Sequence, residues 1–70
     1  MKYHFVVIKK INDRWWYHGA DRNLDLASRT LFNLGKIPGS YITDGRIVEL
    51  KDPEQLERLR KTVNNLPASL

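Results

Sequence analysis

The sequence predicts a small single α+β domain in the order ββα-ββα, with a mostly antiparallel four-stranded sheet and two helices packed on it. Three observations lead to this fold. Seventy residues leave room for only one domain. Two segments, at 2–18 and about 40–50, place a two-residue turn signal between strand-forming residues. Each is followed by a segment with helical periodicity, at about 23–34 and 53–65.

The first hairpin is expected over residues 2–18. Its centre, "FVVI" at 5–8, is apolar on both faces, which is typical of a strand with cover on both sides. Asn12-Asp13 can adopt the positive φ angles that a two-residue turn requires. Residues 14–18 then return as the second strand.

The pairing register of this hairpin follows from the turn length. Ile11 is expected opposite Arg14, and each of the two tryptophans opposite a lysine on its own face. Such pairs give cation–π contacts. The same register places His18 opposite Val7. The remaining expected pairs are Lys10 with Trp15 and Lys9 with Trp16.

The first helix is expected to begin after Asp21 or Asn23, which are both N-cap residue types, and to end near Leu34. Gly35 is placed as a C′ residue. Leu26 falls outside the apolar stripe and is exposed or contacts something else. The stripe expected to face the sheet consists of Leu24, Ala27, Leu31, Phe32 and Leu34.

The second half repeats this pattern without residue identity. Asp44-Gly45 is a strong signal for a hairpin turn. The second helix has Asp52 as its N-cap, Pro53 at its first position and Gln55 to complete a capping box. Its apolar stripe consists of Leu56, Leu59, Val63 and Leu66. The last residues, 67–70, are expected to be frayed.

Composition narrows the class of protein. The net charge is +4, and the charge is unevenly distributed. Residues 1–20 carry four basic side chains and one acidic side chain, whereas residues 41–60 carry four basic and five acidic side chains. A basic surface on the first hairpin attracts nucleic acid or an acidic protein surface. The chain contains no cysteine, so disulfides and cysteine zinc sites are excluded. No segment has the length of a signal peptide core or a membrane span, so a cytoplasmic protein is expected.

Nothing in the sequence indicates an enzyme. A nucleophile elbow and a phosphate-binding loop are both missing, and the glycines of "GKIPGSYITDG" are explained by a helix stop and a turn. His4 and His18, the only histidines, are expected on opposite faces of the sheet, which disfavours a shared metal or acid–base role. We therefore expect no catalytic residues, no metal and no cofactor.

The first hairpin is the best candidate for a binding surface. An aromatic ring beside basic groups stacks on an unpaired base and neutralises its phosphates, and this predicts a nucleic-acid-binding protein. Alternatively, the same hairpin anchors an inhibitor or adaptor on an acidic protein partner. Lys2 and Arg60 are further candidates for a basic surface. The candidate residues are Lys9, Lys10, Arg14, Trp15, Trp16, Tyr17 and His18.

The strand at 5–8 is apolar on both faces, so both faces of the sheet must be shielded from water at this strand. If both helices pack on one face of the sheet, the other face needs a second molecule, and a homodimer is compatible with this need. If the helices divide between the faces, no second molecule is needed. The sequence leaves open which of these holds, and also which of the two tryptophans is exposed.

Overall fold

The computed structural model describes residues 4–39 and 41–70, so the predictions that concern residues 1–3 and 40, including Lys2, lie outside the described residues. The chain forms an α+β domain, as predicted, but the order of its elements is β-β-α-β-α-β. The elements are β1 (Phe5–Ile11), β2 (Arg14–Asp21), α1 (Leu24–Leu34), β3 (Asp44–Glu49), α2 (Pro53–Thr62) and β4 (Val63–Asn64).

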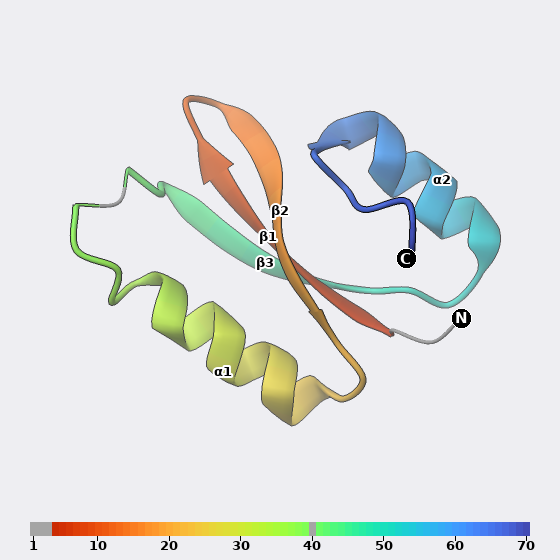
Figure 1. Cartoon of the computed structure of the whole chain (residues 1–70), viewed down its shortest axis with the longest axis horizontal. Coiled ribbons are helices and arrows are strands. Elements are labelled where there is room, and N and C mark those ends of the chain that lie inside the picture. Colours follow the sequence, from red (N-terminus) through yellow and green to blue (C-terminus); the bar gives the residue numbers. More distant parts are fainter. Residues whose placement is uncertain (1–3, 40) are drawn as a thin grey trace.

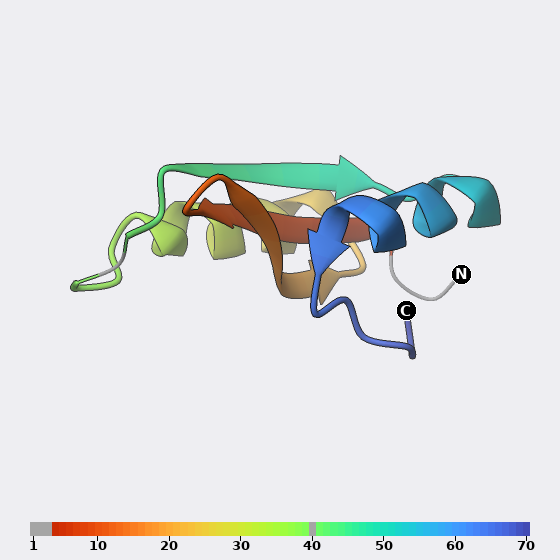
Figure 2. The same ribbon diagram turned by 90° about the horizontal axis from the view of Figure 1, so that it is seen from above.

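The sheet is mixed and has the strand order β3-β1-β2-β4 (Figure 2). The central strand β1 pairs antiparallel with β2 and with β3, while β2 pairs parallel with the short strand β4. This parallel pairing was not predicted. It arises because the chain leaves α2 at Thr62 and immediately runs alongside β2.

The predicted second hairpin is wrong. Asp44 and Gly45 do not form a turn; they begin β3 and pair with Lys10 and Lys9 of β1. Gly45 instead allows α1 to lie close to the sheet, because a Cβ atom there would lie 2.8 Å from Cδ1 of Leu31 and that side chain would have to shift. A glycine that admits a close helix has the same sequence signature as a turn glycine.

The two helices cover opposite faces of the sheet (Figure 1). On the α1 face, Val7 packs with Ala27 and Leu34. On the α2 face, the buried cluster consists of Val6, Ile8, Leu50, Leu56, Leu59 and Val63. The helices therefore supply the cover that the two-sided strand requires, and a second molecule is not needed for it.

The helix starts agree with the sequence. The Asn23 side chain caps α1 by accepting from the Leu26 N–H at 2.9 Å, and Asp52 caps α2 by accepting from the Gln55 N–H at 2.8 Å. Gln55 Oε1 accepts from the backbone N–H of Lys51, one residue before the cap, rather than from Asp52 as a strict capping box requires.

The predicted stripe of α1 is only partly correct. Ala27 and Leu34 are buried, but Leu24 and Phe32 are 53% and 67% exposed, because the narrow sheet meets only part of the helix surface. Leu26, which lies outside the stripe, is exposed.

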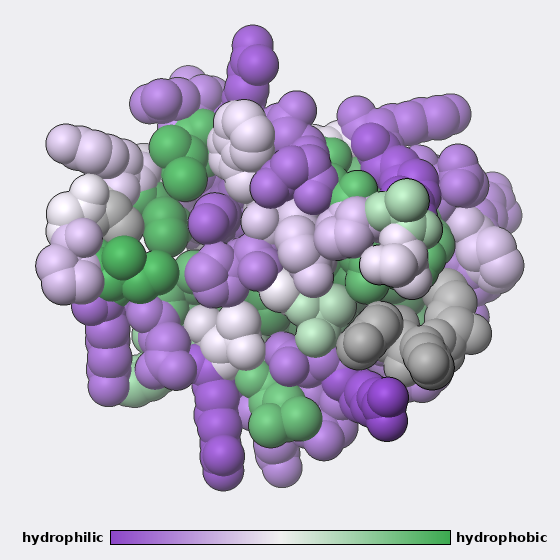
Figure 3. Space-filling view, in the orientation of Figure 1, coloured by the Kyte–Doolittle hydropathy of each residue, from purple (hydrophilic) through white to green (hydrophobic). Residues whose placement is uncertain are grey.

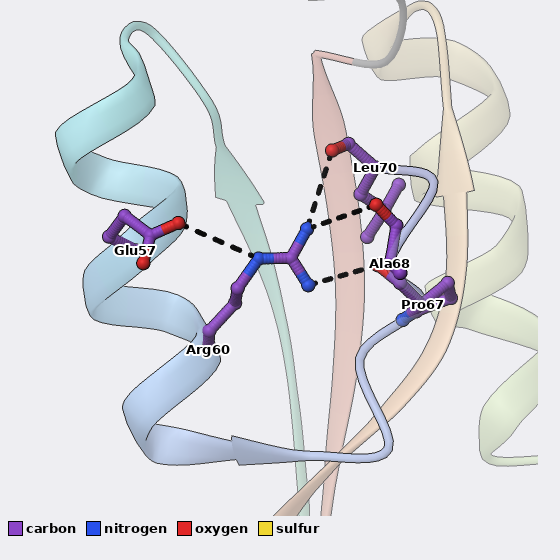
Figure 4. Close-up of polar contacts among 5 residues, drawn as sticks. All are labelled: Glu57, Arg60, Pro67, Ala68 and Leu70. Atoms are coloured by element: carbon purple, nitrogen blue, oxygen red, sulfur yellow. Dashed lines mark hydrogen bonds and ion pairs between the residues drawn. The ribbon is translucent and has the colours of Figure 1, made fainter.

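The C-terminal residues 67–70 are packed, which differs from the expected frayed end. Leu66 and Leu70 lie against the cluster on the α2 face. Arg60 fixes this segment by donating to the backbone carbonyls of Pro67, Ala68 and Leu70 (Figure 4). Its Nε atom also lies 3.8 Å from Glu57 Oε1. Arg60 is thus a structural residue, which argues against its joining a basic surface.

Candidate functional site

The first hairpin has the turn that was predicted. Asn12 and Asp13 have φ angles of 52° and 63°, which join β1 and β2 through two residues. The expected pairs of Ile11 with Arg14, Lys10 with Trp15 and Lys9 with Trp16 are confirmed.

The register changes beyond these pairs. The expected pairing of Val7 with His18 is wrong, because a bulge between Ile8 and Val7 sets Val7 opposite Gly19. The extra residue on β2 leaves His18 and Gly19 together opposite one residue of β1. His18 remains beside Lys9, whose Nζ lies 3.3 Å from His18 Nδ1.

The bulge and the pleat divide the seven candidate residues between the two faces. Lys10, Trp15 and Tyr17 belong to the α2 face, where Trp15 and Tyr17 pack against the buried cluster. Lys9, Arg14, Trp16 and His18 belong to the opposite face. Both tryptophans are half-buried, so neither is simply the core ring or the exposed ring.

A depression of about 610 Å³ lies on the second of these faces, near the hairpin turn. We call it the Trp16 pocket. It brings two of the predicted basic side chains beside the predicted aromatic ring, and no carboxylate lines it. The lining residues are Lys9, Ile11, Asn12, Arg14, Trp16 and Asn65.

Asn65 reaches the Trp16 pocket from the far end of the chain. It follows β4 and has a φ of 53°, a conformation that asparagine tolerates better than most residues. Its Oδ1 accepts from the backbone N–H of Tyr17 at 3.0 Å. The neighbouring Asn64 donates from Nδ2 to the carbonyl of Trp15, also at 3.0 Å. The two asparagines therefore join β4 firmly to the strand that carries both tryptophans.

Two polar groups in this region, the His18 imidazole and the Trp16 indole N–H, are affected by burial. Partial burial, and then the positive charge of Lys9, lower the pKa of His18. A neutral imidazole can accept at Nδ1 the hydrogen bond that the Lys9 ammonium donates. The indole Nε1–H of Trp16 is buried without a hydrogen-bond partner among the described residues. A buried donor in this state is destabilising by about 1–3 kcal/mol.

The α2 face presents a different arrangement, which we call the Trp15 face (Lys10, Trp15 and Arg46). Lys10 Nζ lies 5.6 Å from the centroid of the Trp15 ring, and Arg46 Cζ lies 5.1 Å from it. The predicted cation–π contact with Lys10 is therefore present. Arg46 comes from β3, and its Nε also lies 3.4 Å from Asp44 Oδ2. On the other face, Lys9 contacts His18 in place of the contact predicted with Trp16.

Sequence reasoning missed Asn12, Asn65 and Arg46 as neighbours of the tryptophans. Asn12 was assigned only to the turn. Arg46 was assigned to a second hairpin that does not form, and Asn65 to a helix end. Only the strand order brings β3 and β4 beside the first hairpin, and no local sequence signal reports that order.

Comparison of the chain with known protein families, curated proteins and solved structures finds no match. Within residues 4–39 and 41–70, the histidine and acidic side chains form no group suited to holding a metal ion. Neither helix in this part of the chain has the length and apolar character needed to cross a membrane.

Proposed function

We propose that this chain is a non-enzymatic protein that binds single-stranded nucleic acid through the Trp16 pocket. The observation that supports this most is the meeting of Lys9, Arg14 and Trp16 in one depression. Its volume falls within the range of about 300–1,000 Å³ found for small-ligand sites, which suits a single nucleotide. The absence of carboxylates from its lining suits a polyanion.

The mechanism combines stacking with charge. An unpaired base stacks on the exposed part of the Trp16 ring, and one such contact is worth about 1–3 kcal/mol. The flanking phosphates are neutralised by Lys9 and Arg14, which lie on neighbouring strands of the hairpin. Since each neutralised phosphate of a single strand lowers the slope of log K against log salt by about 0.7, two contacts give a slope of about −1.4.

The test is a fluorescence titration with oligo(dT) at low salt. In a Trp15→Phe variant, Trp16 is the only tryptophan, and we expect oligo(dT) to quench its emission with the salt dependence given above. The matched Trp16→Phe variant, in which only Trp15 emits, is expected to show little quenching. A Trp16→Ala variant should lose most of the affinity, and Trp15→Ala should retain it. If the wild-type chain binds no oligonucleotide at low ionic strength, the proposal is wrong.

A second candidate function is favoured by the Trp15 face. Tryptophan and arginine are the residue types that anchor protein interfaces, and two cations beside Trp15 suit an acidic partner. Among the described residues, the exposed large hydrophobic side chains lie elsewhere: Leu24, Leu26, Phe32, Ile37 and Tyr41. In the view of Figure 3 the apolar side chains form separate patches among polar ones. The Trp15 face is preferred as the anchor because it combines a tryptophan with two cations.

Capture experiments distinguish the two candidates. A partner bound through the Trp15 face should be retained after nuclease treatment and lost in Trp15→Ala. A nucleic acid bound through the Trp16 pocket should show the opposite pattern. Because the two rings lie on opposite faces of one sheet, each variant serves as the control for the other.

A further inference from the structure

His18 is joined to the Trp16 pocket through Lys9. The Lys9 Nζ atom lies 3.3 Å from His18 Nδ1, and Lys9 also lines the pocket. A lysine ammonium has only donors, so the imidazole nitrogen in this contact is the acceptor, and His18 is neutral while the contact is made. A phosphate that binds Lys9 therefore lies close to a histidine that is able to take up a proton.

The charged groups around His18 identify Lys9 as its controlling neighbour. Partial burial, and then the charge of Lys9, lower the pKa of His18. The Asp21 carboxylate is engaged elsewhere, because its Oδ2 accepts from the Thr30 hydroxyl of α1 at 3.1 Å. Among the described residues, no carboxylate forms an ion pair with His18. The strand β4, on the other side of β2, has no charged side chain. The charged side chains on this face of β1 and β2, or on α1, are Lys9, Arg14, Asp21, Asp25 and Arg29, of which the last two are exposed.

A bound phosphate changes the balance that keeps His18 neutral. In the free chain, the Lys9 ammonium opposes a second positive charge on the imidazole. A phosphate held by Lys9 offsets that charge and itself attracts a proton to His18. If the phosphate also draws Lys9 away from Nδ1, the neutral imidazole loses the hydrogen bond that it accepts. Both effects act in the same direction, and both favour the protonated histidine.

We infer that the binding of single-stranded nucleic acid in the Trp16 pocket is coupled to the uptake of a proton by His18, so that binding tightens as the pH falls below neutrality. This inference rests on the proposed function, since it concerns the regulation of the same site. Couplings between two ligands of one protein are typically about 5–150-fold. Because Lys9 and His18 are only half-buried, we expect the low end of this range, with oligo(dT) binding about fivefold more tightly at pH 5.5 than at pH 7.5.

The first measurement is the affinity for oligo(dT) at pH 7.5, 6.5 and 5.5 and constant ionic strength, by quenching of Trp16 in the Trp15→Phe background. The oligonucleotide has no terminal phosphate, because a phosphate monoester titrates near pH 6 and would add its own pH dependence. His18→Gln keeps an acceptor for Lys9 but takes up no proton, so the tightening at low pH should be lost. His4→Gln is the matched control, because it removes an exposed histidine that does not line the pocket, and it should keep the tightening.

The second measurement detects the proton itself. Calorimetric titration of the wild-type chain with oligo(dT) at pH 6.5, in two buffers of different ionisation enthalpy, gives the number of protons taken up on binding. We expect uptake by the wild type and by His4→Gln, and none by His18→Gln. A purely structural role of His18 would change the affinity without producing this proton uptake.

The outcomes separate this inference from the function on which it rests. Equal affinities at the three pH values, without proton uptake, would overturn the coupling and leave nucleic-acid binding standing. Proton uptake that persists in His18→Gln would overturn the role given to His18. Failure of oligo(dT) to bind at every pH would overturn the proposed function together with the inference. Because calorimetry of the wild type needs no change at residue 18, it stays decisive if His18→Gln does not fold.

Discussion

Arg60 on α2 donates to the backbone carbonyl of Pro67, with Nη1 3.1 Å from the carbonyl oxygen. Two further contacts, at 3.4 and 3.5 Å, extend from Nη2 to the next part of the same segment. One side chain therefore holds residues 67–70 against the α2 face, where Leu70 packs on the core. The segment depends on tertiary contacts, because its one internal backbone hydrogen bond outside helices and strands joins Leu70 to Pro67.

We expect Arg60→Ala to destabilise the chain by about 1–2 kcal/mol, because charged hydrogen bonds are lost and the packing of Leu70 loosens with them. Urea unfolding monitored by circular dichroism measures this change. Arg58→Ala, at an exposed position of the same helix, should change the free energy of unfolding by less than about 0.5 kcal/mol. Equal effects of the two substitutions would contradict the structural role of Arg60.

Gly45 provides a test of how closely α1 approaches the sheet. A Cβ atom at this position would lie 2.8 Å from Leu31 Cδ1 and 3.3 Å from Leu34 Cδ1. We expect Gly45→Val to destabilise the fold by about 1–3 kcal/mol, since overpacking displaces the helix. Thermal unfolding shows the loss, and Gly35→Ala is the control because its Cβ meets only an ordinary contact, with Phe32 O at 3.8 Å. If Gly45 were instead a turn glycine, valine would disturb the β1–β3 edge and leave α1 in place.

We predict that a substitution in the turn of the first hairpin can increase the stability of the fold. Asp13 has a φ of 63°, a region that glycine enters without steric cost. Asn-Gly is the preferred pair for a two-residue turn of this kind. Asp13→Gly should therefore raise the free energy of unfolding by about 0.5–1 kcal/mol, because the cost of about 1–2 kcal/mol for a side chain in this region exceeds the entropy that glycine adds to the unfolded chain. Asp13→Ala should lower it, and a stabilising alanine would contradict the turn geometry.

His18 makes the stability depend on pH. Burial and the charge of Lys9 lower the pKa of His18 in the folded chain, so the unfolded chain takes up a proton first as the pH falls. The contribution of the neutral imidazole is complete above the unfolded pKa of about 6.5 and declines as the pH falls from there towards the folded pKa. Urea unfolding at pH 7.5, 6.5 and 5.5 should show a decline for the wild type that is reduced in His18→Gln. Parallel pH profiles would exclude a role for His18.

The local features of the fold could be predicted from the sequence. Asn12-Asp13, Asn23 and Asp52 act through their own backbone neighbourhood, so the sequence suffices to find them. Asp44-Gly45 was misassigned because a turn and a close helix contact both require glycine. The strand Val63–Asn64 was missed because Val63 continues the apolar spacing of α2.

The candidate site could be predicted only to the extent that it lies within one hairpin. Lys9, Arg14 and Trp16 were found because the turn length brings them together. Asn65 and Arg46 reach the tryptophans through the non-local pairings of β4 and β3. The bulge at His18 was also missed, because the turn length predicts the register only for the pairs close to the turn.

The strand order has a consequence for the folding pathway. Of the three strand pairings, the β1–β2 hairpin alone is local, while Lys10 must pair with Asp44 and Trp16 with Asn64, which are distant in the sequence. Because long loops close slowly and at an entropic cost, the hairpin is expected to form first and β4 to dock late. Lys9, Arg14 and Trp16 then come together early, and Asn65 arrives with the last strand. The nascent chain can thus present charge and an aromatic ring before Asn65 completes the lining of the Trp16 pocket.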